Sequence, residues 1–138
     1  MKRNQFWLWL LLLPPLLQSC EKKYPNAETI IQGKIVDEND NPMEGVAFVF
    51  SGINKTSLLN STGTFYQTTK SDKNGEFTIS QIIPKKTDYI DLNFTGSQPQ
   101  YRNYIFTNST LKAYIPDAIS NYITIGKTNN LKFQIKKP

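Results

Sequence analysis

Hydrophobic and polar residues alternate with a period of two along much of the chain. In residues 88–94, Ile90, Leu92 and Phe94 alternate with polar or amphipathic residues, and residues 131–137 repeat the pattern. Such alternation predicts strands that pack on one face and meet water on the other. The same alternation, or an enrichment in β-branched and aromatic residues, predicts further strands at 29–36, 45–50, 64–70, 76–80 and 101–106.

The residues between these segments are typical of turns and loops. Asn74 and Gly75 tolerate a positive φ, so residues 71–76 are expected to form a tight hairpin. Residues 51–64 are polar and contain two glycines. We expect them to form the longest loop, and long loops are frequent places for function.

Residues 111–125 carry a weaker pattern. Two short strands, 112–116 and 121–126, are expected around the turn residues Pro116 and Asp117. No segment after the N-terminal apolar run has a sustained helical period. Several short strands with turns between them predict an all-β fold, a single β-sandwich.

The first 19 residues have the pattern of an export signal. Lys2 and Arg3 precede an apolar run over residues 6–13. The run is too short to cross a bilayer, which takes about 20 apolar residues, and Pro14 and Pro15 disfavour one continuous helix. We therefore expect residues 1–19 to be a cleaved signal peptide.

Cys20 is the only cysteine of the chain. Leu17 stands three residues before it and Ser19 directly before it, which resembles the lipobox of bacterial lipoproteins, whose cysteine is acylated. The alternative is a secreted protein with a free thiol, but an unpaired cysteine in an exported chain needs an explanation. The resemblance implies a cell-envelope protein held by lipid on Cys20, with residues 20–28 as a tether and residues 29–138 as the domain. We expect the outer membrane, with its side open.

A second resemblance covers about residues 29–83. The segment from Gly33 to Phe48, followed by residues 71–79, is similar to the carboxypeptidase regulatory-like domain. The family pattern consists of turn and core residues, so it implies a fold and no chemistry. It implies a prealbumin-like β-sandwich of about seven strands. The matching positions are Gly33, Ile35, Asp37, Pro42, Met43, Gly45, Val46, Phe48, Ser71, Asp72, Gly75, Phe77 and Ile79.

Residues 36–42 are rich in oxygen ligands that calcium could use. Asp37, Asn39 and Asp40 are the candidate ligands, and the segment resembles the cadherin linker except for a missing residue before Pro42. Calcium takes six to eight oxygens, and this loop offers about four. The same residues suit a turn, because Asn and Asp tolerate unusual dihedrals and proline presets φ. We therefore expect a hairpin and no metal.

Composition and charge exclude several classes of function. Without Lys2 and Arg3, 14 basic residues face 11 acidic ones, and they form no basic stripe for nucleic acid. The chain has no histidine, which excludes histidine-based catalysis and most zinc sites. The nearest carboxylate pair, Asp88 and Asp91, is expected to be exposed on a strand. No enzyme activity and no cofactor are expected.

Binding is the class of function that is left. Tyr66, Tyr101, Tyr104 and Tyr114 are candidate contact residues, although tyrosines also pack on sheet surfaces. We expect an interaction module for an envelope protein or glycan, which predicts an exposed apolar or aromatic patch at one loop end. The alternative is a structural subunit joined by strand pairing, which predicts a long unprotected edge. A small hydrolase, with a deep acidic pocket, ranks last.

Overall fold

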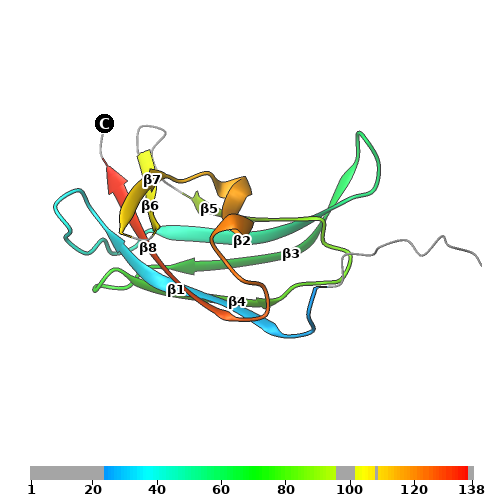
Figure 1. Ribbon diagram of the computed structural model, residues 1–138, viewed down its shortest axis with the longest axis horizontal. Coiled ribbons are helices and arrows are strands. Elements are labelled where there is room, and N and C mark those ends of the chain that lie inside the picture. Colours follow the sequence, from blue (N-terminus) through cyan, green and yellow to red (C-terminus); the bar gives the residue numbers. More distant parts are fainter. Residues whose placement is uncertain (1–23, 96–101, 108, 137–138) are drawn as a thin grey trace, which may run out of the picture.

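The computed structural model describes residues 24–95, 102–107 and 109–136. Over these residues, eight strands form two sheets that pack face to face (Figure 1). The strands are β1 (Glu28–Val36), β2 (Ala47–Lys55), β3 (Ser61–Lys70), β4 (Glu76–Ile82), β5 (Tyr89–Thr95), β6 (Arg102–Thr107), β7 (Thr110–Ala113) and β8 (Thr128–Lys136). The prediction of an all-β sandwich is confirmed.

The two sheets differ in size. The larger one has the order β4-β1-β8-β6-β7, and the smaller one has the order β3-β2-β5. Neighbouring strands are antiparallel except β1 and β8, which run parallel with Ile35 opposite Phe133. Strand β1 therefore lies inside the larger sheet, between β4 and the last strand of the chain.

The core lies between the sheets and is rich in aromatic rings. The alternation in the sequence correctly predicted which residues of β5 face the core. Ile90 and Leu92 are buried, and Asp91 between them is only half-buried. Phe48 of β2 stacks on Phe77 of β4 with ring centroids 4.6 Å apart. Offset aromatic pairs of this kind add stability beyond the area that they bury.

Two predicted hairpins are instead corners between the sheets. The turn over residues 37–41 follows β1 of the larger sheet, but β2 lies in the smaller sheet. Likewise, the turn at residues 72–75 leads from β3 to β4 in the other sheet. Both turns are tight: the Asp37 N–H donates to Asn41 O at 2.8 Å, and the Asp72 N–H donates to Glu76 O at 2.8 Å. Turn residues therefore fix the local reversal, while packing of the core selects the partner strand.

The expected loop at residues 51–64 is mostly strand. Strands β2 and β3 extend through it and pair from Ala47 and Lys70 out to Lys55 and Ser61, leaving a short turn at 56–60. The register shifts at Gly52 and Ile53. Such a bulge bends a hairpin, and the β2–β3 connection rises from the sheet at the right of Figure 1. The prediction failed because β-branched and small polar residues at an exposed hairpin lack clear alternation.

The second short strand expected near the C-terminus is absent from the described residues. Strand β7 covers Thr110–Ala113, and a 3₁₀ turn covers Pro116–Asn121. Residues 122–127 then run as turns and loop, and the Asn129 side chain bonds the backbone of this segment at Thr124. The Asn129 side chain accepts from the Thr124 N–H at 2.6 Å and donates to Thr124 O at 3.1 Å.

The domain begins before the predicted boundary at residue 29. Tyr24 is packed against the core, Pro25 lies beside Gly126, and β1 starts at Glu28. The predicted tether over residues 20–28 is thus part of the domain from Tyr24 onward. Cys20 and the predicted signal peptide lie outside the described residues. Within the described ranges, no helix has the length and apolar character to span a membrane.

Candidate interaction surface

The start of β1 and the β2–β3 hairpin lie at the same end of the sandwich (Figure 1). Glu28, at the start of β1, pairs with Ile82 at the end of β4. Residues 83–88 then cross to β5, whose first residue, Tyr89, pairs with Ile53 near the end of β2. Figure 1 shows the start of β1 (blue) and the β2–β3 connection at its right-hand side. We call this the N-terminal end of the sandwich, formed by residues 24–28, 53–62, 82–89 and 122–127.

Two fully exposed leucines form the tip of the β2–β3 hairpin. Leu58 and Leu59 have relative exposures of 103% and 95%. The tip is nevertheless ordered by hydrogen bonds. The Thr56 N–H donates to Asn60 O at 3.0 Å, and the Ser57 hydroxyl accepts from the Asn60 N–H at 3.1 Å. The backbone thus holds both apolar side chains out in water.

The base of the hairpin is tied to the neighbouring loop. The Lys55 N–H donates to the Asp88 carboxylate at 2.7 Å, and the hydroxyls of Thr64 and Thr87 lie 2.8 Å apart. The Asp88 N–H donates to Ile53 O at 2.8 Å. The base of the hairpin and the 83–88 loop are therefore bonded to each other at three places.

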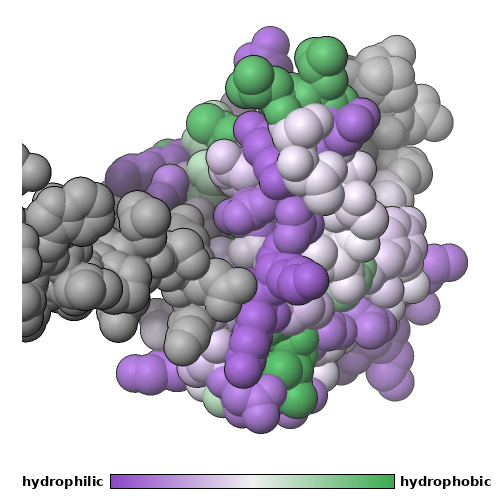
Figure 2. All heavy atoms as spheres, turned by 90° about the vertical axis from the view of Figure 1, so that its right-hand side faces the viewer, coloured by the Kyte–Doolittle hydropathy of each residue, from purple (hydrophilic) through white to green (hydrophobic). Residues whose placement is uncertain are grey.

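More apolar and basic groups are exposed at the N-terminal end. Ile82 and Tyr89 are 49% and 54% exposed, and the Lys55 ammonium lies 4.7 Å from the centroid of the Tyr89 ring. Lys85 and Lys86 are exposed in the connecting loop. Figure 2 looks at this end and shows hydrophobic side chains gathered at its upper edge, among polar ones. Leu58 and Leu59, with Tyr89 near the base of the hairpin, form what we call the apolar tip surface.

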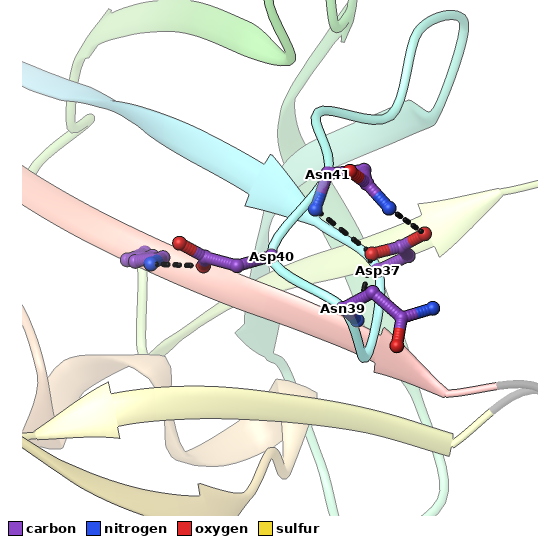
Figure 3. A network of polar contacts seen from close by, with 5 residues as sticks. Asp37, Asn39, Asp40 and Asn41 are labelled. Atoms are coloured by element: carbon purple, nitrogen blue, oxygen red, sulfur yellow. Dashed lines mark hydrogen bonds and ion pairs between the residues drawn. The ribbon is translucent and has the colours of Figure 1, made fainter.

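The candidate calcium ligands point apart. The Asp37 carboxylate accepts from the N–H groups of Asn39 and Asn41, at 2.8 and 2.9 Å, and from the Asn41 side chain at 3.1 Å. Asp40, with a φ of 64°, turns away and pairs with Lys132 at 2.5 Å (Figure 3). In the described part of the chain, no three His, Cys, Asp or Glu residues are grouped as metal ligands would be.

The candidate tyrosines are not brought together. Tyr66 is 67% exposed on β3, and Tyr104 is half-buried on β6 with the Lys136 ammonium 5.1 Å from its ring centroid. Tyr114 is buried, and its hydroxyl donates to Leu92 O at 2.6 Å, so it is a packing residue, and its candidacy as a contact residue was wrong. Tyr101 lies outside the described residues. Sequence reasoning missed Leu58 and Leu59. The signal that could have found them is that they are an adjacent apolar pair within a polar stretch.

A shallow groove of about 420 Å³ crosses the outer face of β4, β1 and β8. Its lining is mainly polar and includes the exposed side chains of Lys34, Glu76 and Asn130. The Gln32 side-chain amide donates to the Asn130 side chain across it at 2.9 Å. The groove offers hydrogen bonds and charges of both signs, without an aromatic side chain on its exposed face to stack on a ligand.

The carboxylate pair considered from the sequence is engaged in structural contacts. Asp91 accepts a hydrogen bond from the Ser51 hydroxyl on the neighbouring strand. Asp88 accepts from the Lys55 N–H, as described above. Both acids therefore hold strand β2 against its neighbour.

No protein-family model matches the chain, and no curated protein matches it at a significant level. Among solved structures, the chain is similar to 3-chlorocatechol 1,2-dioxygenase from Rhodococcus opacus 1CP, with 16% identity and a TM-score of 0.47 over 85% of this chain. It spans 62% of the length of that enzyme.

Two further solved structures are similar at the same level. The plantain pollen allergen Pla l 1 has 14% identity and a TM-score of 0.42, over 80% of this chain and 94% of the allergen. The dioxygenase domain of a carbohydrate-binding fusion protein from Streptomyces sp. SirexAA-E has 14% identity and a TM-score of 0.45, over 85% and 84%. At these identities and TM-scores, the likenesses carry no argument about family or activity.

Proposed function

We propose that this chain is a lipid-anchored protein of the bacterial cell envelope whose β-sandwich binds another envelope component and catalyses no reaction. The observation that carries the proposal is the apolar tip surface. Leu58 and Leu59 are held fully exposed by an ordered turn. Exposed apolar surface of this kind marks a place of contact with a partner or a membrane.

The anchor is Cys20, preceded by the lipobox-like residues Leu17 and Ser19. Thioether-linked and amide-linked acyl chains would give stable attachment, since each buried CH₂ contributes about 0.8 kcal/mol. The expected membrane is the outer membrane, facing either side. Tyr24 already packs against the core, which supports a short link between the lipid and the sandwich.

We also propose membership of the carboxypeptidase regulatory-like family, with a prealbumin-like sandwich. Several motif positions have a structural reason in the observed fold. Ser71 joins both corner turns, because its hydroxyl accepts from the Val46 N–H at 3.0 Å and donates to Met43 O at 2.7 Å. A Cβ on Gly33 would lie 1.7 Å from the Leu131 carbonyl oxygen, so only glycine fits between β1 and β8 there. The motif is therefore explained by folding alone, which fits an accessory binding domain.

The proposed partner is an envelope protein or glycan, or another envelope component that covers the apolar tip surface. Lack of histidine and the structural use of Asp88 and Asp91 support contact without turnover. The scattered charge supports a partner other than nucleic acid. The polar groove over β4, β1 and β8 is a second surface, suited to a hydrogen-bonding ligand.

Two measurements on cells that produce the full chain test the proposal. The intact mass of the purified protein should show a chain that begins at Cys20 and carries acyl groups. A photoreactive residue at position 59 should form an adduct with an envelope component, and the matched residue at exposed Lys73, in the turn at 72–75, should form less. An unmodified thiol on Cys20 would contradict the proposed anchor. Equal labelling at positions 59 and 73 would contradict the proposed contact surface.

A structural subunit joined by strand pairing is the second candidate. Strand β3 has ten residues and forms an edge of the smaller sheet, pairing with β2. Long edge strands are templates for pairing with another chain. Native mass spectrometry of the detergent-solubilised protein distinguishes the two: ordered oligomers favour strand pairing, and a monomer rejects it.

A further inference from the structure

We infer that the component covering the apolar tip surface is the lipid bilayer itself, so that the sandwich stands with its N-terminal end against the membrane. This inference rests on the proposed anchor at Cys20. It assigns Leu58 and Leu59 to the interface between headgroups and acyl chains, and Lys85 and Lys86 to contact with anionic headgroups.

The first argument is the short reach of the chain. Tyr24 is the first described residue and packs on the core at the N-terminal end. Tyr24 comes four residues after Cys20, and four residues of fully extended chain span at most about 14 Å. An acylated Cys20 therefore keeps Tyr24 close to the bilayer surface, and the end of the domain that holds Tyr24 must face it.

The second argument is the place of the exposed apolar residues. The β2–β3 connection lies at this same end and reaches outward beyond the start of β1 in Figure 1. Leu58 and Leu59 form its tip, and Tyr89 lies near its base with 54% of its surface exposed. Tyrosine suits the membrane interface because its ring is apolar and its hydroxyl is polar. A protein partner would have to share this end with the membrane.

The third argument is charge. Lys55, Lys85 and Lys86 all lie at the N-terminal end, and the Lys55 ammonium lies 4.7 Å from the centroid of the Tyr89 ring. Asp88 in the same loop is engaged by the Lys55 backbone N–H. Basic residues near an anionic lipid surface attract it, and apolar residues beside them insert at the interface. The combination matches a lipid surface better than it matches an apolar protein groove.

The processed chain offers a clean optical test. The two tryptophans of the full sequence, Trp7 and Trp9, both lie in the predicted signal peptide, so Leu59→Trp introduces a single tryptophan into the mature protein. The acylated variant is reconstituted into vesicles of equal parts phosphatidylethanolamine and phosphatidylglycerol, with or without brominated acyl chains. Lys73→Trp, exposed in the turn at residues 72–75, is the matched control.

We expect brominated lipid to reduce the Leu59→Trp emission by about twofold or more, because interfacial residues sit about 5–10 Å deep, and to leave Lys73→Trp nearly unchanged. Replacing Lys85 and Lys86 by glutamine in the Leu59→Trp protein should weaken the quenching. An acylated protein with equal emission loss at both positions, or with none, overturns the inference and assigns the tip to a protein partner.

The intact mass separates this inference from the proposed anchor. A chain without acyl groups contradicts the lipoprotein. If brominated vesicles still quench the Leu59→Trp emission of that chain, the inference that the N-terminal end contacts the bilayer holds without the anchor. If an unacylated chain is not quenched, both proposals are wrong.

Discussion

The two ends of the sandwich are built in opposite ways. At the far end, which we call the turn end, hydrogen bonds join the segments beside the two turns. The Ser71 hydroxyl bonds the Val46 N–H and Met43 O, and the Ile35 N–H donates to Gly75 O at 2.8 Å. At the N-terminal end, the ordered hairpin tip exposes Leu58 and Leu59. The motif residues at the turn end satisfy one another, whereas the exposed leucines at the N-terminal end leave apolar surface uncovered. Hydrogen bonds among motif residues therefore account for the turn end, and the uncovered leucines are the basis of the proposed contact.

The largest expected effect comes from Gly75 at the turn end. Its φ is +74°, and a Cβ there would lie 2.4 Å from the Ile35 carbonyl oxygen. Gly75→Ala should lower the free energy of unfolding by about 3 kcal/mol or more, because backbone strain and a backbone clash act together. Urea unfolding of the mature protein, followed by tyrosine fluorescence, measures the change.

Gly45 is the matched control for this change. It has a similar φ of +76°, but nothing lies within 4 Å of its added Cβ. Gly45→Ala should therefore cost only about 1–2 kcal/mol, the strain of the left-handed conformation. Equal losses for the two variants would contradict the close packing of the corner turns.

Ser71 gives the next largest effect. Ser71→Ala removes the hydroxyl that bonds the Val46 N–H and Met43 O, and it leaves both groups without that partner. We expect a loss of about 1–3 kcal/mol. Ser71→Thr keeps the hydroxyl. Recovery of most of the lost stability in Ser71→Thr, by the same unfolding assay, checks the assignment.

The ion pair between Asp40 and Lys132 should matter little. Both side chains are well exposed, at 70% and 39%. Lys132→Met should change the free energy of unfolding by no more than about 1 kcal/mol, the range of surface pairs.

Calcium should leave the Tm of the parent protein unchanged, because Asp37 and Asp40 point apart. A rise in Tm with calcium, seen by differential scanning calorimetry, would restore the metal hypothesis.

The smallest effect on stability is expected at the apolar tip. Replacing Leu58 and Leu59 together by serine should shift the free energy of unfolding by less than about 0.5 kcal/mol, since neither side chain is buried. A large loss of stability would mean that the leucines pack within the domain, contrary to their exposure.

The sequence was most informative where one face of a strand is buried. Alternation over residues 88–94 placed Ile90 and Leu92 in the core, and the turn residues near Asp37 and Asp72 marked both reversals. Pairing could not be predicted, because the same tight turn suits a hairpin and a corner between sheets. The exposed leucines at the hairpin tip were also missed, since exposed hairpin strands lack the apolar period that burial imposes.

The central claim is that the N-terminal end lies on the bilayer while the rest of the sandwich faces water. Hydroxyl-radical footprinting of the acylated, unmutated protein in vesicles tests it, with Tyr66 on β3 as the exposed reference within the same chain. We predict that Leu58 and Leu59 are protected from oxidation while Tyr66 is modified freely. Oxidation of Leu58 and Leu59 at the rate expected for free, fully exposed leucine would contradict the account.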